Sequence, residues 1–142
     1  MKKLLMNPNP VSINAIAIAR IIVGCYFILH GHELFDSKAM QGFAGYLEKD
    51  LGFPYPMLMA YLRTGAELFG GIMLVLGVFT RLGAFLIMFT MLVAAFTAGK
   101  GDLLGEGEFT FIYAIFCLVF ILIGPGKFSL DYYFSNKESI AS

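Results

Sequence analysis

Four long runs of hydrophobic residues alternate with short polar stretches along the chain. The runs cover residues 13–31, 57–79, 82–98 and 108–124. Each is roughly long enough for a helix to cross the 30 Å or so of hydrocarbon in a bilayer, at about 1.5 Å of rise per residue. The tight connection at residues 80–81 makes the second and third helices antiparallel neighbours. The pattern predicts an all-α integral membrane four-helix bundle with up-down-up-down order, in a single domain over residues 1–142.

The few charged residues inside these runs share helical faces with small residues. In the second run, Arg63, Glu67, Gly70 and Gly71 fall on one stripe of a helix that advances about 100° per residue. In the first run, Arg20 also shares its face with small residues. A water-soluble helix shows the reverse, with its charges outward. These polar faces are therefore expected to contact other helices, and the large apolar faces to contact lipid.

The connection between the first two runs, residues 30–56, is amphipathic in its middle part. It predicts a short helix on the membrane surface, where Tyr46, Phe53 and Tyr55 would suit the interface. A tight hinge is expected at Thr80-Arg81. The glycine-rich, charged segment 99–107 is too polar to remain in hydrocarbon.

The composition agrees with a membrane protein. The chain is 58% hydrophobic and 14% charged, and its mean hydropathy is +0.77, values that are rare among soluble domains. The net charge of zero argues against a nucleic acid partner. Basic residues on the side of the two termini are Lys2, Lys3, Arg81, Lys127 and Lys137, against Lys38, Lys49 and Lys100 on the other side. This bias predicts cytoplasmic termini.

Two buried charges are expected to pair across helices. Arg20 and Glu67 both lie roughly 15 Å from the same membrane face if the first two helices are level. Because an isolated charge in mid-membrane costs about 2.5–3.5 kcal/mol on insertion scales, we predict a structural ion pair between them. Arg63 would share the Glu67 carboxylate or reach Glu108. The pair either holds the helices together or belongs to a ligand or proton site, and the sequence leaves both interpretations open.

Cofactor classes can be compared by the ligands that they need. His30 and His32 are two residues apart on one helix and would point about 200° apart, which argues against a haem held by both within one chain. No nucleotide or flavin fingerprint is present. Cys25 and Cys117 form no CxxC or metal-spaced cluster, so we expect no metal site and assign the cysteines no role. A lipid-soluble quinone is the cofactor that fits best.

A quinone headgroup needs hydrogen-bond donors and a proton source. We expect these from Arg20, Arg63, Glu67, His30 and Glu108, in a pocket where Gly24, Gly70 and Gly71 make room. Glu67, His30 and Glu108 are the candidates for a catalytic role. For His30, an ordinary interfacial histidine is the alternative.

Over nearly its whole length the chain resembles DoxX family membrane proteins. The resemblance lies in ARIIVGCYFILHGHELF (residues 19–35), GAELFGGIMLVLGVFTRLGA (65–84), Glu108 and GPGKFSLD (124–131). It implies a four-span bacterial or archaeal inner-membrane protein, related to the small subunit of thiosulfate:quinone oxidoreductase and to membrane partners of detoxifying or oxidative-stress enzymes. The positions that match the family are Arg20, His30, Glu67, Arg81, Glu108 and Asp131.

Three function classes follow from this reading. The first is a subunit of a quinone-linked oxidoreductase or of a detoxification complex, with a soluble or membrane-bound redox partner. The second is a non-catalytic membrane anchor for a soluble enzyme, and the third is a carrier of a small hydrophobic or anionic compound. A carrier commonly has broken helices, and no discontinuous span is evident here. A homo-oligomer is left open.

Overall fold

The computed structural model describes the backbone of residues 11–141 and, within that range, the side chains of residues 15–136. Every regular element in this part of the chain is helical, which confirms the all-α prediction. The elements are α2 (Val11–Gly31), the 3-10 helix η1 (His32–Phe35), α3 (Ser37–Lys49), α4 (Pro56–Leu76), α5 (Thr80–Thr97), α6 (Glu108–Ile123) and α7 (Leu130–Ala141).

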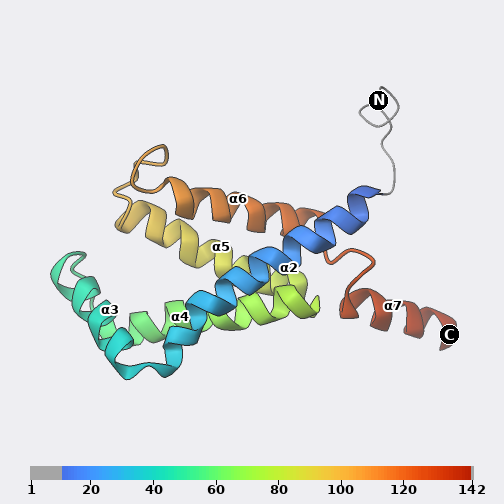
Figure 1. Cartoon of the computed structure of the whole chain (residues 1–142), viewed down its shortest axis with the longest axis horizontal. Coiled ribbons are helices and arrows are strands. Elements are labelled where there is room, and N and C mark those ends of the chain that lie inside the picture. The colour runs from blue at the N-terminus through green and yellow to red at the C-terminus, as the bar shows by residue number, and fades with distance from the viewer. Residues whose placement is uncertain (1–10, 142) are drawn as a thin grey trace.

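The helices form an elongated array with two distinct ends (Figure 1). One end, called the α3 end below, holds α3 and the loop between α5 and α6. The other, called the α7 end, holds α7 and the first turns of α2. Helix α4 packs against both α2 and α5, and α6 packs against α5. Helices α2 and α6 meet through aromatic side chains, since the rings of Tyr26 and Tyr113 stack with centroids 4.8 Å apart.

Glycines set the register between α2 and α4. A Cβ atom at Gly31 would lie 2.6 Å from the Leu68 backbone, and one at Gly24 would lie 2.8 Å from the Gly71 carbonyl oxygen. Because larger numbers on α2 face smaller numbers on α4, the two helices are antiparallel. Backbones this close leave no room for larger side chains, as is common where membrane helices pack. Gly24 and Gly71 thus serve helix packing rather than the ligand pocket expected from the sequence.

The core runs between the four long helices. Gly70 of α4 packs against Ile87 of α5, and Gly83 of α5 packs against Met73 of α4. Because larger numbers on α4 face smaller numbers on α5, these helices are also antiparallel. The buried apolar residues at the centre are Val23, Phe27, Leu74, Ala84, Ile87, Met91, Ala114, Cys117 and Phe120. Since α2, α4, α5 and α6 all contribute, one core joins them.

The turn between α4 and α5 is held in place by a residue from the first turn of α7. Helix α4 stops at Leu76 because Gly77 takes the left-handed conformation, with φ at 67°. Phe79 is also left-handed, with φ at 47°. The Asp131 carboxylate accepts hydrogen bonds from the backbone N–H groups of Phe79 (2.9 Å) and Thr80 (3.1 Å), in the manner of a helix cap. The hinge therefore precedes Thr80, which already begins α5.

Helix α3 is the short amphipathic helix expected between the first two runs. Asp36 caps it by accepting from the Lys38 N–H at 2.9 Å. Its apolar face, with Met40, Ala44 and Leu47, is buried against Ala60 of α4. Because α4 extends beyond the end of α2, its first turns pack against α3 instead.

The loop between α5 and α6 is polar and exposed. The Lys100 ammonium lies 3.0 Å from the Glu106 carboxylate, and this contact raises the pKa of Lys100. Both side chains are solvent-exposed, so the pair adds little to stability.

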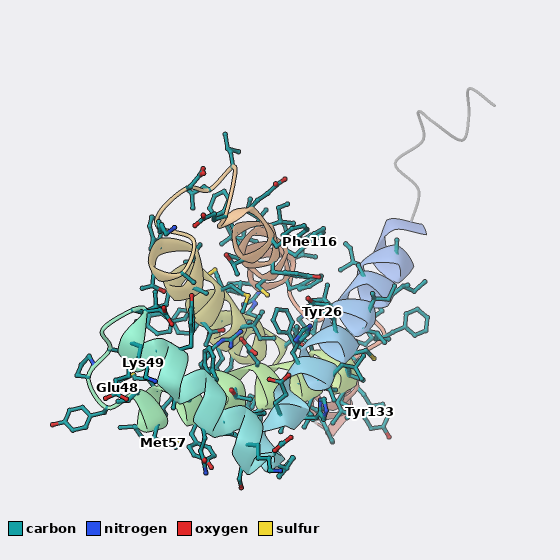
Figure 2. All side chains as sticks on the ribbon, turned by 60° about the vertical axis from the view of Figure 1, so that its left-hand side comes forward. Tyr26, Glu48, Lys49, Met57, Phe116 and Tyr133 are labelled. Atoms are coloured by element: carbon teal, nitrogen blue, oxygen red, sulfur yellow. The ribbon has the colours of Figure 1, made fainter. Side chains whose placement is uncertain are left out.

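Three helices in the described part of the chain are long and apolar enough to cross a membrane, namely α2, α4 and α5. Helix α6 is equally apolar but has 16 residues. Large apolar side chains cover the outside of these helices, as Figure 2 shows for Phe116 on α6. Tyr133 on α7 is likewise exposed. Such extensive apolar exposure is typical of surfaces that contact lipid.

Candidate functional site

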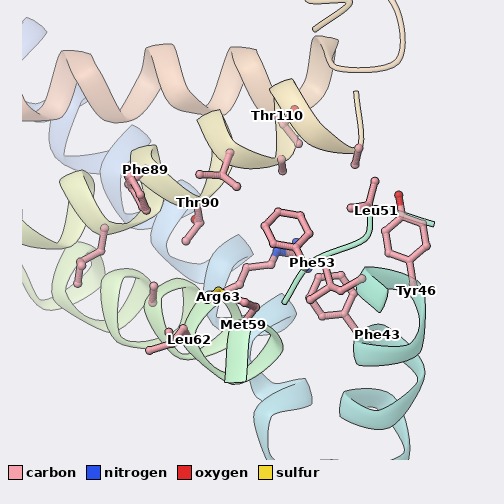
Figure 3. Close-up of a pocket in the computed structure, with 16 residues that line it drawn as sticks. Phe43, Tyr46, Leu51, Phe53, Met59, Leu62, Arg63, Phe89, Thr90 and Thr110 are labelled. Carbon is pink, nitrogen blue, oxygen red and sulfur yellow. The ribbon is translucent and has the colours of Figure 1, made fainter. Parts of the chain in front are cut away.

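A cavity of about 540 Å³ lies between α3, α4 and α5 near the α3 end (Figure 3). Its walls are apolar and aromatic, with Phe43 and Tyr46 from α3, Phe53 from the following loop and Phe89 from α5. The remaining lining residues are Leu47, Leu51, Met59, Leu62, Arg63, Ala66, Leu86, Thr90, Val93, Ala94, Ala98 and Thr110. A few polar groups in an apolar hollow of this size are typical of small-molecule sites.

Arg63 brings the only charge among these lining residues. Its guanidinium lies over the ring of Phe43, 4.6 Å from the centroid, which is a cation–π contact. The hydroxyl groups of Thr90 and Thr110 donate to the carbonyl oxygens of Ile87 and Gly107. Arg63 is therefore the strongest hydrogen-bond donor available to a ligand in the cavity.

Glu67 lies one turn further along α4 and forms an ion pair with Arg63. The Arg63 Nε and Glu67 Oε1 atoms are 2.9 Å apart, although they are not aligned as a hydrogen bond. Glu67 is only 2% exposed and does not line the cavity itself. Glu33 on η1, which packs against α4, adds a second negative charge that acts on Glu67. The expected contact between Arg63 and Glu67 is confirmed.

The ion pair expected between Arg20 and Glu67 is corrected by the structure. Arg20 is buried at the α7 end, where its two terminal nitrogens donate to the carbonyl oxygens of Pro125 and Phe128, both at 2.6 Å. It lies beside Gly77, ten residues along α4 from Glu67 and hence roughly 15 Å away along the helix axis. Asp131 also acts on Arg20 through its charge.

The register of α2 against α4 explains this correction. The expected pair required Gly31 to be level with Met57, whereas the structure places Gly31 against Leu68. The close contacts of Gly24 and Gly31 fix that offset. The lengths of the hydrophobic runs do not predict this offset. They suggest that the ends of α2 and α4 are level, whereas α4 extends past the end of α2 and packs against α3.

Arg81 and Asp131, both family-matching residues, belong to the architecture of the α7 end. Asp131 caps α5. The guanidinium of Arg81 lies near Gly124, just after α6, where a positive charge favourably meets the carbonyl end of a helix. Arg20, Arg81 and Asp131 together connect residues 124–131 with the ends of α4, α5 and α6.

His30 and Glu108 lie outside the cavity lining. His30 is exposed and packs on Tyr26, with ring centroids 4.5 Å apart, on the face of α2 that turns toward α6. Glu108 is exposed at the first turn of α6. The structure thus brings Arg63 and Glu67 together and leaves Arg20, His30 and Glu108 in other places.

The two cysteines lie apart from each other in the described part of the chain. Cys25 is exposed on α2, and Cys117 is buried in the hydrophobic core. Among the described residues, no group of three or more His, Cys, Asp or Glu side chains is placed to hold a metal ion.

The part of the cavity wall that α3 forms was not predicted from the sequence. Phe43, Leu47 and the loop residue Phe53 complete the cavity, yet the sequence was interpreted as a helix lying on the membrane surface. The signal was present, since aromatic residues recur on one side of an amphipathic segment. That periodicity alone does not tell whether the apolar side faces lipid or protein.

The chain is similar to one protein family and to several proteins of known sequence. A family model described as DoxX matches residues 15–100. An uncharacterised protein of Haemophilus influenzae is 33% identical over 129 residues, which cover 86% of this chain and 92% of that protein. The protein named "Inner membrane protein YphA" of Escherichia coli is 36% identical over 126 residues, covering 80% and 86%. The protein named "Putative oxidoreductase CatD" of Bacillus subtilis is 28% identical over 124 residues, covering 86% and 89%. No solved structure matches the chain significantly.

Proposed function

The chain belongs to the DoxX family, and from this premise we propose that it is a quinone-binding subunit of a membrane redox complex. The membrane setting follows from the family and from three apolar helices of spanning length. The observation that carries the proposal is the cavity, an apolar and aromatic hollow with one guanidinium aimed into it. The name of the Bacillus subtilis relative agrees with a redox role.

In this proposed function, α2, α4, α5 and α6 are four membrane spans in up-down-up-down order. Antiparallel contacts along α2–α4 and α4–α5 support this order. With 16 residues, α6 is about 24 Å long and somewhat shorter than the hydrocarbon thickness, which a locally thinner bilayer accommodates. Its outward residues are large and apolar, as lipid contact requires.

Cytoplasmic termini are part of the proposal, on the basis of the lysine and arginine bias. Of the residues behind it, Lys2 and Lys3 lie outside the described part, as does the side chain of Lys137. With Cys25 and Cys117 replaced by alanine, Lys3→Cys should react with a membrane-impermeant thiol reagent only from the cytoplasmic side, and Gly45→Cys only from the outside. Gly45 has open space for a side chain. Labelling of both positions from one side would contradict the orientation.

A quinone suits the cavity because of its charge and shape. The Arg63–Glu67 pair is neutral overall, so it favours a neutral ligand whose carbonyl oxygen accepts from the guanidinium. The aromatic walls offer faces on which a flat ring can stack. When bound, a quinone would supply the electron-accepting ring, while Arg63 would orient it and Phe43, Phe53 and Phe89 would exclude water.

Quinone binding should raise the thermal stability of the purified protein. At a short-chain ubiquinone concentration about one hundred times the dissociation constant, binding stabilises the fold by about 2.7 kcal/mol, which corresponds to roughly 5–10 °C in the melting temperature. Ala94→Phe, which fills the cavity, should abolish this shift. Ala15→Phe, on the exposed side of α2, should retain it. If the shift is absent in the native sequence, or unchanged in Ala94→Phe, the cavity is not a quinone site.

A further inference from the structure

Beside the cavity, one positive and one negative side chain balance each other. The Arg63 side chain is 37% exposed and faces the cavity, whereas Glu67 lies behind it in the protein interior, 2.9 Å away. A neutral quinone oxygen can accept from the guanidinium without changing the local charge. The opposite charges of Arg63 and Glu67 therefore favour a neutral ligand in the cavity.

An anionic ligand would upset this balance. Two negative charges would then share one guanidinium, and one of them, the Glu67 carboxylate, is buried where charges are weakly screened. Glu33 on η1 acts on Glu67 with a further negative charge. Of the other cationic groups on the elements that pack against α4, His30 on α2, His32 on η1, and Lys38 and Lys49 on α3 are all exposed to solvent. The arginines of α2 and α5 do not compensate either. Arg20 on α2 lies beside Gly77, and Arg81 on α5 lies near Gly124, both at the α7 end.

We propose that Glu67 takes up a proton when an anionic quinone binds beside Arg63, so that the cavity accepts the anion and the proton together. The inference rests on the proposed function and deepens it. The proton comes from solution and converts the Glu67 carboxylate to a carboxylic acid. Arg63 keeps its charge and exchanges one negative partner for another, and no electron moves in this step. The net charge of the site stays the same.

Two matched ligands test the coupling in the native sequence. A hydroxynaphthoquinone is ionised at neutral pH, whereas its methoxy counterpart has the same ring and stays neutral. Calorimetric titrations in buffers of different ionisation enthalpy should show uptake of about one proton per hydroxynaphthoquinone and none for the methoxy compound. By linkage, the affinity for the anion should fall by up to about tenfold for each unit of rising pH.

Variants assign the proton to its residue. Glu67→Gln should bind the hydroxynaphthoquinone without proton uptake, and its affinity should no longer fall as the pH rises. Glu48→Gln and Glu108→Gln, which change exposed carboxylates, should behave like the native protein. If Glu67→Gln does not fold, infrared difference spectra of the native protein should still gain a carboxylic acid band on binding of the anion, and Glu33→Gln should keep it.

The outcomes separate the two claims. Binding of both naphthoquinones without proton uptake overturns this inference and leaves the quinone site standing. Uptake that persists in Glu67→Gln, or that vanishes in Glu33→Gln, also overturns it. If neither compound binds the native protein, the proposed function falls and this inference falls with it.

Discussion

Replacing Arg20 with alanine should destabilise the folded protein by about 3–5 kcal/mol, because the buried guanidinium donates two hydrogen bonds to partly buried carbonyl oxygens, and a hydrogen bond from a charged group contributes about 1.5–3 kcal/mol. The guanidinium spans the carbonyls of Pro125 and Phe128, both at 2.6 Å. It also lies near Asp131, which caps α5. Loss of Arg20 should therefore loosen the whole α7 end. Unfolding in mixed detergent, followed by circular dichroism, measures the change.

Arg81→Ala is the matched control for this prediction. Arg81 is an exposed arginine at the same end of the molecule, with no buried carbonyl partner among the described residues. Its loss should cost only about 0.5 kcal/mol, the value of a charge at a helix terminus. Arg20→Lys should fall between the two, since an ammonium cannot reproduce the fork of a guanidinium. Equal stabilities of Arg20→Ala and Arg81→Ala would show that the carbonyl contacts do not stabilise the α7 end.

The helices could be predicted from the sequence because lipid exposure imposes a simple pattern. Each hydrophobic run matched a helix, and glycines such as Gly77 and Gly107 lie at the helix ends. The contact between Arg63 and Glu67 was also predictable, because residues four apart on a helix are neighbours. Local rules were enough for both.

Contacts between helices were harder to predict. The partner of Arg20 depends on the register of α2 against α4 and on a turn more than one hundred residues away. The spacing of hydrophobic residues along the chain predicts neither this register nor the position of that turn. The same holds for the cavity, whose walls come from α3, α4 and α5 together. The motif GPGKFSLD is visible in the sequence, but the contacts of its Phe128 carbonyl with Arg20 and of its Asp131 carboxylate with Phe79 appear only in the folded structure.

Removing the cationic donor from the cavity should lower quinone affinity about tenfold, which corresponds to the loss of one charge-assisted hydrogen bond of about 1.4 kcal/mol. Arg63→Ala alone would leave Glu67 buried without its partner, which would destabilise the fold. The double variant Arg63→Gln/Glu67→Gln removes both charges and keeps the local charge at zero. Arg81→Ala, an arginine at the opposite end, is the control and should bind quinone normally.

Photolabelling with an azido derivative of a short-chain ubiquinone tests the central claim most directly. In vesicles, the native protein should be labelled within residues 43–66 and 86–98, the two ranges that contain every lining residue except Thr110. Unlabelled quinone should compete, and the double variant should need about tenfold more reagent to reach the same labelling. Labelling spread over outward-facing residues such as Phe116 and Leu122, without competition, would contradict a quinone site in this cavity.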